Sequence, residues 1–124
     1  MNPILRKLFF RGQSPILLLG VPGEFKKTVK NFGVPIHSQA KGQYDFILAF
    51  VKSLAEGEQT AKILKTAAAE NAVIWVGYPK GTSSKYKSDY NRDAGHALMA
   101  QHDLDGVSLI SLDADWSAMR FKIV

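Results

Sequence analysis

The sequence predicts a single-domain α/β sandwich with a mixed, mainly parallel sheet, helices on its faces and an antiparallel hairpin at its C-terminal edge. Its length of 124 residues suits one domain with one hydrophobic core. From residue 15 onward, short apolar runs alternate with helical patterns, which is typical of α/β domains. The last two apolar runs are separated only by the short Asp113–Asp115 link, which is best explained by a hairpin.

The composition is that of a soluble globular protein, with 46% hydrophobic and 22% charged residues. The absence of cysteine excludes disulfides, cysteine nucleophiles and thiolate metal sites. The apolar stretch from Pro15 to Val21 is far shorter than a membrane-spanning helix, and no cleavage pattern marks a targeting segment. We therefore expect a cytoplasmic protein with no membrane span.

The formal net charge is +5 at pH 7, and the basic excess belongs to the first third of the chain. Residues 1–43 hold seven Lys and Arg residues against Glu24 alone. Such an excess attracts anionic partners when it is focused on one surface. A nucleic-acid-binding domain, however, typically adds a reading helix or stacking aromatic residues, and neither stands out here. We expect no nucleic-acid partner, and the sequence identifies no protein partner.

Residues 1–12 are expected to form a short amphipathic helix packed on the domain. Asn2 supplies a helix cap and Pro3 a favourable first-turn residue. An apolar stripe follows at helical spacing, made of Ile4, Leu5, Leu8 and Phe9. Docking on the domain's own sheet is favoured over attachment to an anionic membrane surface, because the segment is brief.

The first half of the α/β pattern contains two buried strands with a helix between them. Ile16–Leu19 is a continuous apolar run ended by Gly20, as expected for a strand covered on both faces. A helix opens at Pro22 and stops at Gly33, which can adopt the left-handed conformation of a helix end. Asp45–Val51 is the second predicted strand.

A long helix and the remaining strands follow. Ser53 and Glu56 fit a capping box, in which the serine accepts from an early backbone N–H and the glutamate returns to the serine N–H. This helix is predicted to end at Asn71. The other predicted elements are strands Ala72–Val76, Val107–Leu112 and Ser117–Val124 and a helix from Asp89 to Gln101.

The loop Gly20–Gly23 follows a strand and precedes a helix, which is where α/β folds bind phosphate or nucleotide through backbone N–H groups. Its two glycines complete neither a dinucleotide fingerprint nor a phosphate-loop motif, and Pro22 removes a donor. A tight turn before a helix is the favoured interpretation. The sequence therefore indicates no cofactor.

The connection from Tyr78 to Asp89 is the main candidate ligand site. It follows a predicted strand and carries three lysines and four Ser or Thr hydroxyls. Such groups suit a phosphate or carboxylate, and the start of the next helix adds partial positive charge. The alternative is a solvated surface loop, for which these residues are ordinary. The candidate ligand-binding residues are Lys80, Thr82, Ser83, Lys85 and Arg92.

The segment after this connection offers an acid/base alternative. Asp89, Asp93 and His96 recur at spacings of three and four, so a carboxylate beside His96 could tune it as a base. Arg92 paired with either aspartate on a helix surface is the simpler interpretation. The three histidines show no metal-ligand spacing, so we expect no metal.

The C-terminal link carries Asp113 and Asp115, a pair of carboxylates one residue apart. They could contribute to a divalent-cation site, but no glutamate follows at calcium-loop distance. Turn formation through local bonds to the backbone is favoured.

Several short segments together resemble a small family of uncharacterised bacterial proteins, the domain-of-unknown-function family numbered 3052. The resemblance spans about Tyr44 to Phe121. It implies a compact bacterial α/β protein and carries no established activity. The segments are Trp75–Lys80, Ser83–Lys85, Asp89–Asp93 and Asp115–Phe121.

Three hypotheses about function follow from these patterns. The first is a domain that binds a phosphate-bearing or carboxylate small molecule at the 78–92 region. The second is a small enzyme that uses His96 with Asp93 or Asp89 as an acid/base pair. The third is a protein-interaction or regulatory module that uses the basic amphipathic start or an exposed edge strand.

Overall fold

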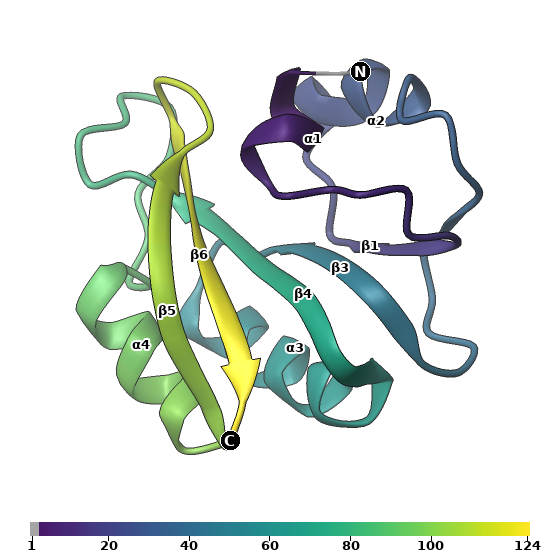
Figure 1. The fold of residues 1–124 in the computed structure, drawn as a ribbon. Helices are drawn as coiled ribbons and strands as arrows, with labels where there is room; N and C mark the ends of the chain where they lie inside the picture. Colours follow the sequence, from purple (N-terminus) through teal and green to yellow (C-terminus); the bar gives the residue numbers. More distant parts are fainter. Residues whose placement is uncertain (1–2) are drawn as a thin grey trace.

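The computed structural model describes residues 3–124 and contains one six-stranded sheet with the strand order β2-β1-β3-β4-β6-β5. The pairs of β1 with β2, β1 with β3 and β3 with β4 are parallel, whereas β6 is antiparallel to both β4 and β5 (Figure 1). This arrangement confirms the predicted fold class. The strands are β1 (Ile16–Leu19), β2 (Ile36–His37), β3 (Tyr44–Phe50), β4 (Ala68–Pro79), β5 (Leu104–Ser111) and β6 (Trp116–Ile123).

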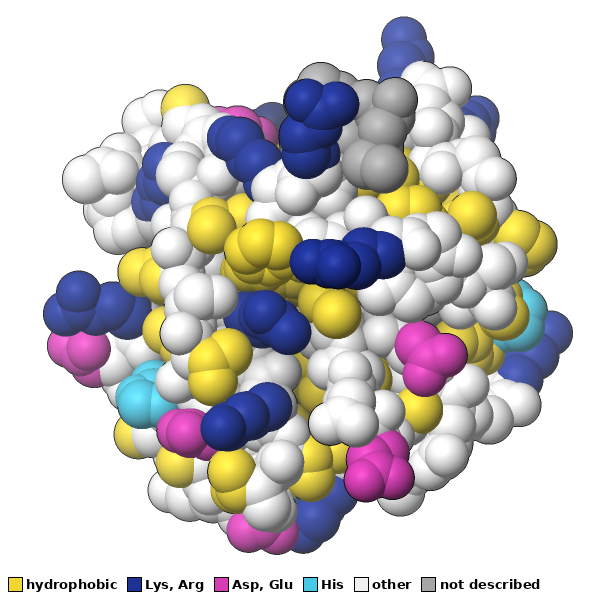
Figure 2. Space-filling model, in the orientation of Figure 1, with side chains coloured by type: hydrophobic (Ala, Val, Ile, Leu, Met, Phe, Trp, Pro, Cys, Tyr) yellow, Lys and Arg dark blue, Asp and Glu magenta, His cyan; other side chains and the backbone are white. Residues whose placement is uncertain are grey.

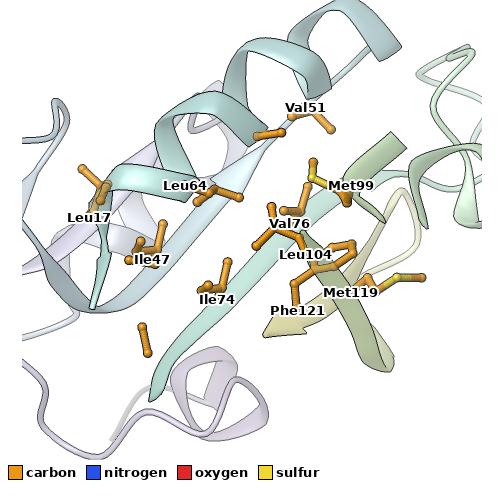
Figure 3. Close-up of a cluster of buried hydrophobic side chains, with 14 of the residues drawn as sticks. Leu17, Ile47, Val51, Leu64, Ile74, Val76, Met99, Leu104, Met119 and Phe121 are labelled. Carbon is orange, nitrogen blue, oxygen red and sulfur yellow. The ribbon is translucent and has the colours of Figure 1, made fainter. Parts of the chain in front are cut away.

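Helices cover the two faces of this sheet. α3 (Leu54–Ala67) and α4 (Arg92–Ala100) pack on one face through Leu64 and Met99, which join Ile47, Val76 and Phe121 in a buried cluster (Figure 3). α1 (Pro3–Lys7), the short 3-10 helix η1 (Gly23–Phe25) and α2 (Lys26–Lys30) lie toward the other face. The second cluster is built there from Leu5, Leu8, Phe25, Phe32, Phe46 and Trp75, among others.

The N-terminal segment is fastened to the sheet by apolar and polar contacts. Leu5 and Leu8 are buried, and the Trp75 Nε1 donates to the Leu8 carbonyl oxygen at 2.8 Å. The ring of Phe9 stacks on Trp75 with the centroids 6.2 Å apart. The predicted cap Asn2 lies outside the described residues.

The long helix is shorter than predicted, and the strand after it is longer. α3 ends at Ala67 because Ala68 already pairs with Tyr44 in the sheet. Asn71 lies inside β4 with a left-handed φ of 62°, where the register between β3 and β4 shifts. Asn71 therefore bends the start of a strand instead of closing a helix.

Caps explain the other differences at the helix ends. The Ser53 Oγ accepts from Glu56 N at 3.1 Å as predicted, but the Glu56 carboxylate bonds Lys52 N instead of Ser53 N. Asp89 does not open α4, because its Oδ1 accepts from Leu54 N at the start of α3. Asn91 caps α4, and its side chain accepts from Ala94 N.

On the face shown in Figure 2, Lys and Arg side chains are spread among apolar and acidic ones. No helix in residues 3–124 has the length and apolar character needed to cross a bilayer.

Candidate functional site

The strand order reverses between β1 and β3. The chain runs from β1 to β2 on one side and then returns to β3 on the other, with all three strands parallel. In open α/β sheets, ligands bind outside the carboxyl ends of the strands at such a reversal. The loop after β1 and the residues after β3 therefore form the first place to look for a site.

The loop after β1 has a backbone shaped by two glycines. Gly20 has a φ of +64°, and a Cβ there would lie 2.5 Å from the carbonyl oxygen of Phe50, at the end of β3. Gly23 opens η1, and a Cβ there would meet no other atom within 4 Å. The main chain is therefore held close to β3 at Gly20 and is open to an incoming molecule at Gly23.

The 80–91 connection runs back from the end of β4 across the end of β3. The Ser88 Oγ donates to the Lys52 carbonyl oxygen at 2.8 Å, and Asp89 holds Leu54 N at 2.8 Å. Figure 1 shows this connection leaving β4 before it descends into α4. The connection thus lies beside the residues that follow β3.

Four side chains join this connection to the loop after β1, and we call them the Glu24 cluster: Glu24, Lys85, Tyr86 and Trp116. The Tyr86 hydroxyl lies 2.8 Å from both carboxylate oxygens of Glu24. The Trp116 Nε1 donates to the same carboxylate at 3.2 Å, and the Lys85 Nζ lies 3.4 Å away. Three segments far apart in the sequence therefore meet on one carboxylate.

Aromatic rings of neighbouring strands and loops pack against the Glu24 cluster. Trp116 is fully buried, and its ring packs edge-on against Phe50 at 5.4 Å and Tyr86 at 5.1 Å. Phe25 stacks on Phe50 at 5.2 Å. Gly77 leaves room for this packing, since a Cβ there would lie 2.9 Å from the Phe50 ring.

The contacts of Glu24 shift two pKa values in opposite directions. Burial opposes ionisation of Glu24, but hydrogen bonds, led by those from Tyr86 and Trp116, outweigh burial and lower the pKa of Glu24 to about 2. Burial and the bond to Glu24 raise the pKa of Tyr86 to about 12. At neutral pH the cluster is therefore a carboxylate held by a neutral phenol.

A separate hollow of about 360 Å³ lies at the carboxyl end of β4, beside the start of α4. It is lined by Tyr78, Lys80, Thr82, Asn91, Arg92 and Ser117, among others. A neighbouring hollow of about 240 Å³ shares Arg92 and Asp93 and reaches His96.

The structure brings only part of the predicted ligand site together. Lys80, Thr82 and Arg92 line the 360 Å³ hollow, whereas Ser83 and Lys85 do not contribute to its lining. The Ser83 hydroxyl donates to Asp115 at 2.7 Å, and Lys85 pairs with Glu24. Binding of a ligand by these five residues stays a prediction.

The carboxylate that lies near His96 is neither of the two that the sequence predicted. The His96 Nε2 lies 3.7 Å from Asp105 on β5, whereas Asp93 pairs with Arg92 and Asp89 caps α3. The fold places β5, which carries Asp105, beside His96 on α4. Local helical spacing does not encode this arrangement.

The acidic link before β6 forms a turn. The Asp113 Oδ1 accepts from Asp115 N and Trp116 N, each at 2.8 Å. Across the described part of the chain, no three His, Asp or Glu side chains gather as metal ligands would.

Sequence reasoning did not select Glu24, Tyr86 or Trp116 as site residues. One signal was available, because Glu24 is the single acidic residue of the first 43 and directly follows the loop Gly20–Gly23. Its partners could not be found this way, since Tyr86 and Trp116 lie 62 and 92 residues further along the chain.

Known proteins resemble this chain in structure but not in sequence. No family model and no curated protein matches it. The PH0226 protein of Pyrococcus horikoshii has a TM-score of 0.67 at 8% identity, over 98% of this chain and 87% of that one. A SAM-dependent methyltransferase from Aquifex aeolicus has a TM-score of 0.67 at 13% identity, over 98% and 88% of the two chains. A TehB-like SAM-dependent methyltransferase from Corynebacterium glutamicum has a TM-score of 0.60 at 10% identity, over 98% and 85%.

These comparisons correct the function expected from the sequence. A domain that only binds an anion, with no activity to assign, is contradicted by structural neighbours that are methyltransferases. The resemblance to the family numbered 3052 stays a prediction. At identities of 8 to 13%, the fold is what these proteins share with this chain.

Proposed function

We propose that this chain binds S-adenosylmethionine at the carboxyl ends of β1 and β3 and takes part in methylation of a small molecule. The observation that carries the proposal is the glycine-bearing loop at the point where the strand order reverses, in a sheet shared with methyltransferases. When bound, the cofactor supplies an electrophilic methyl group. We place this activity in the cytoplasm, as expected from the sequence.

The backbone of the loop after β1 fits such a cofactor. Gly20 keeps the loop within contact of Phe50, and the open side of Gly23 lets a ligand approach the main chain. One departure concerns the sugar, because residues 38–43 after β2 include no Asp or Glu that could accept from ribose hydroxyls. The loop after β1 would therefore supply most of the recognition.

The methyl acceptor has a place in the 360 Å³ hollow at the end of β4. This volume lies at the lower end of the range of small-molecule sites. Its lining combines the Tyr78 ring with hydrogen-bonding groups of Thr82, Asn91 and Ser117. These groups would orient a polar acceptor by hydrogen bonds, beside the charged side chains of Lys80, Arg92 and Asp93.

The first test is direct binding to the full chain, measured by calorimetry with S-adenosylmethionine and S-adenosylhomocysteine. We expect saturable binding and a higher melting temperature with either compound, because a ligand of the folded state stabilises that state. Gly23→Val should weaken binding by at least about tenfold, since its side chain would fill the approach to the loop.

Ala97→Val is the control. Ala97 is exposed on α4 and lies outside both the loop after β1 and the lining of the 360 Å³ hollow. It should leave the affinity for both compounds unchanged. Absence of binding to the wild-type chain at millimolar ligand would reject the proposed function, and equal effects of the two substitutions would reject the loop as its site.

A further inference from the structure

We propose that two copies of this chain associate through β5, the outer strand of the sheet, and that antiparallel pairing of β5 with the partner's β5 joins the two sheets. The inference is independent of the proposed function, because β4 and β6 separate β5 from the strands that carry the proposed cofactor site. It is carried by an uncovered strand edge, a hollow beside that edge and opposite charges at the two ends of the strand.

The outer side of β5 has no neighbouring strand. β5 is the last strand of the sheet and pairs with β6 alone in the part of the chain that the structure describes. Ser108 and Leu109 point to opposite faces of the sheet, yet both are exposed, so neither face is covered at this point. The unpaired backbone groups of such an edge are a template for a further strand.

The sequence of β5 does little to prevent such pairing. The strand contains neither Lys nor Pro, which commonly keep exposed edges apart. One bulge, between Gly106 and Ser108, interrupts the pairing with β6. The four residues after the bulge, Ser108–Ser111, pair regularly with β6, so they are able to continue the ladder on their other side.

Apolar groups on this edge have a place for an apolar partner. Val107 is 45% exposed and Leu109 is 44% exposed, although both are aliphatic. The hollow of about 240 Å³ lies between α4 and β5, and its lining includes Leu109, Met119 and the ring of His96. An aliphatic side chain from a second copy fits this hollow, so pairing would remove apolar surface of both copies from water.

The two ends of β5 carry opposite charges. Asp105, near the start of the strand, is half exposed. At the end of the strand, the Lys7 Nζ donates to the Ser111 carbonyl oxygen at 3.4 Å, and the Lys80 Nζ donates to the Ser111 hydroxyl at 2.6 Å. Antiparallel pairing centred near Ser108 would place Asp105 of each copy beside the two lysines of the other copy.

The two lysines are available for a partner's carboxylate. Within residues 3–124, neither Lys7 nor Lys80 forms an ion pair. The carboxylates of the following turn are bonded to other groups, because Asp113 accepts from backbone N–H groups of its own turn and Asp115 accepts from the Ser83 hydroxyl. A strand with an acid at one end and cations at the other is complementary to an antiparallel copy of itself, which favours a second copy over an unrelated strand.

Sedimentation equilibrium of the full chain tests the association. We expect a dimer that dissociates on dilution, and amide hydrogen exchange at residues 107–111 should slow as the protein concentration rises. Leu109→Lys should weaken association by at least about tenfold, because a lysine on an edge strand opposes pairing. Ile63→Lys is the matched control, since Ile63 is an aliphatic residue on α3 that is 37% exposed, and it should leave the association unchanged.

A charge exchange tests the orientation of the two strands. Asp105→Lys alone, or Lys7→Glu alone, places like charges beside each other at both ends of the pairing, so each variant should self-associate about tenfold more weakly. An equimolar mixture of the two variants restores both pairs of opposite charge, and heterodimers should form with about the wild-type affinity. Lys7 is chosen because Lys80 also lines the 360 Å³ hollow.

Three results would overturn the proposal. The first is a wild-type chain that stays monomeric at millimolar concentration. The second is a dimer that Leu109→Lys leaves intact, which would place the interface elsewhere. The third is a mixture of Asp105→Lys and Lys7→Glu that associates no better than either variant alone, which would exclude the antiparallel arrangement.

Discussion

Gly20 shows how a single position joins two strands and shapes the candidate site. Its backbone is left-handed, with φ at +64°, and its α-carbon faces the Phe50 carbonyl oxygen. A side chain there is disfavoured both by backbone conformation and by contact with an atom that cannot rotate away. The loop after β1 depends on this residue for its close approach to β3.

Gly20→Ala is therefore expected to destabilise the chain more than a glycine substitution that meets only the backbone cost. We expect a loss of about 2–4 kcal/mol in the free energy of unfolding, measured by urea denaturation, from strain and overpacking together. Gly12→Ala is the control, because Gly12 also has a positive φ, +85°, but no atom within 4 Å. Equal losses in the two variants would contradict the role assigned to Phe50.

At the scale of elements, α3 and α4 pack closely around one aromatic ring. A Cβ at Gly57 on α3 would lie 2.8 Å from the Tyr90 ring, and a Cβ at Gly95 on α4 would lie 2.3 Å from it. Tyr90 is almost fully buried, and burial raises the pKa of its hydroxyl. Both helices have a glycine where the ring needs space.

In the Gly95→Ala variant, helix propensity and packing therefore change the free energy of unfolding in opposite directions. Propensity alone predicts a gain of about 1 kcal/mol, whereas the contact with Tyr90 predicts a loss of about 1–3 kcal/mol from overpacking. We expect urea denaturation to show a net loss of stability, because the Tyr90 ring is enclosed by both helices. In a Tyr90→Leu background the penalty should shrink, and a stabilised Gly95→Ala protein would refute this packing.

At the scale of the whole molecule, the Glu24 cluster couples acid stability to the tertiary structure. Three segments must be in place for the carboxylate to receive its hydrogen bonds. The pKa of Glu24 falls from 4.5 to about 2 in the folded chain. A lowered folded-state pKa contributes stability above pH 4.5, and this contribution is lost as the pH falls toward 2.

The Glu24→Gln variant isolates this contribution. We expect the wild-type chain to be more stable than the variant above pH 4.5, with the difference shrinking between pH 4.5 and 2. Urea denaturation of both proteins across this range measures the difference directly. A difference that stays constant with pH would show that Glu24 ionisation is not coupled to folding.

The order and kind of most elements could be predicted from local sequence patterns, because these features depend on residues close together in the chain. The continuous apolar run of Ile16–Leu19 marks a strand buried on both faces, and the Asp113–Asp115 link forces the chain to turn back. The strand β2 was missed, because it is only two residues long and has no periodicity to read.

The contacts between polar side chains, in contrast, could not be predicted from the sequence. Asp89 has the spacing of a helix residue beside His96, yet it caps α3, and Asp105 is the carboxylate that reaches His96. Lys85 pairs with Glu24, which lies 61 residues before it in the chain. Hydrogen bonds and ion pairs of this kind act over about 3–4 Å, so they form only after strand order and register have brought distant segments together.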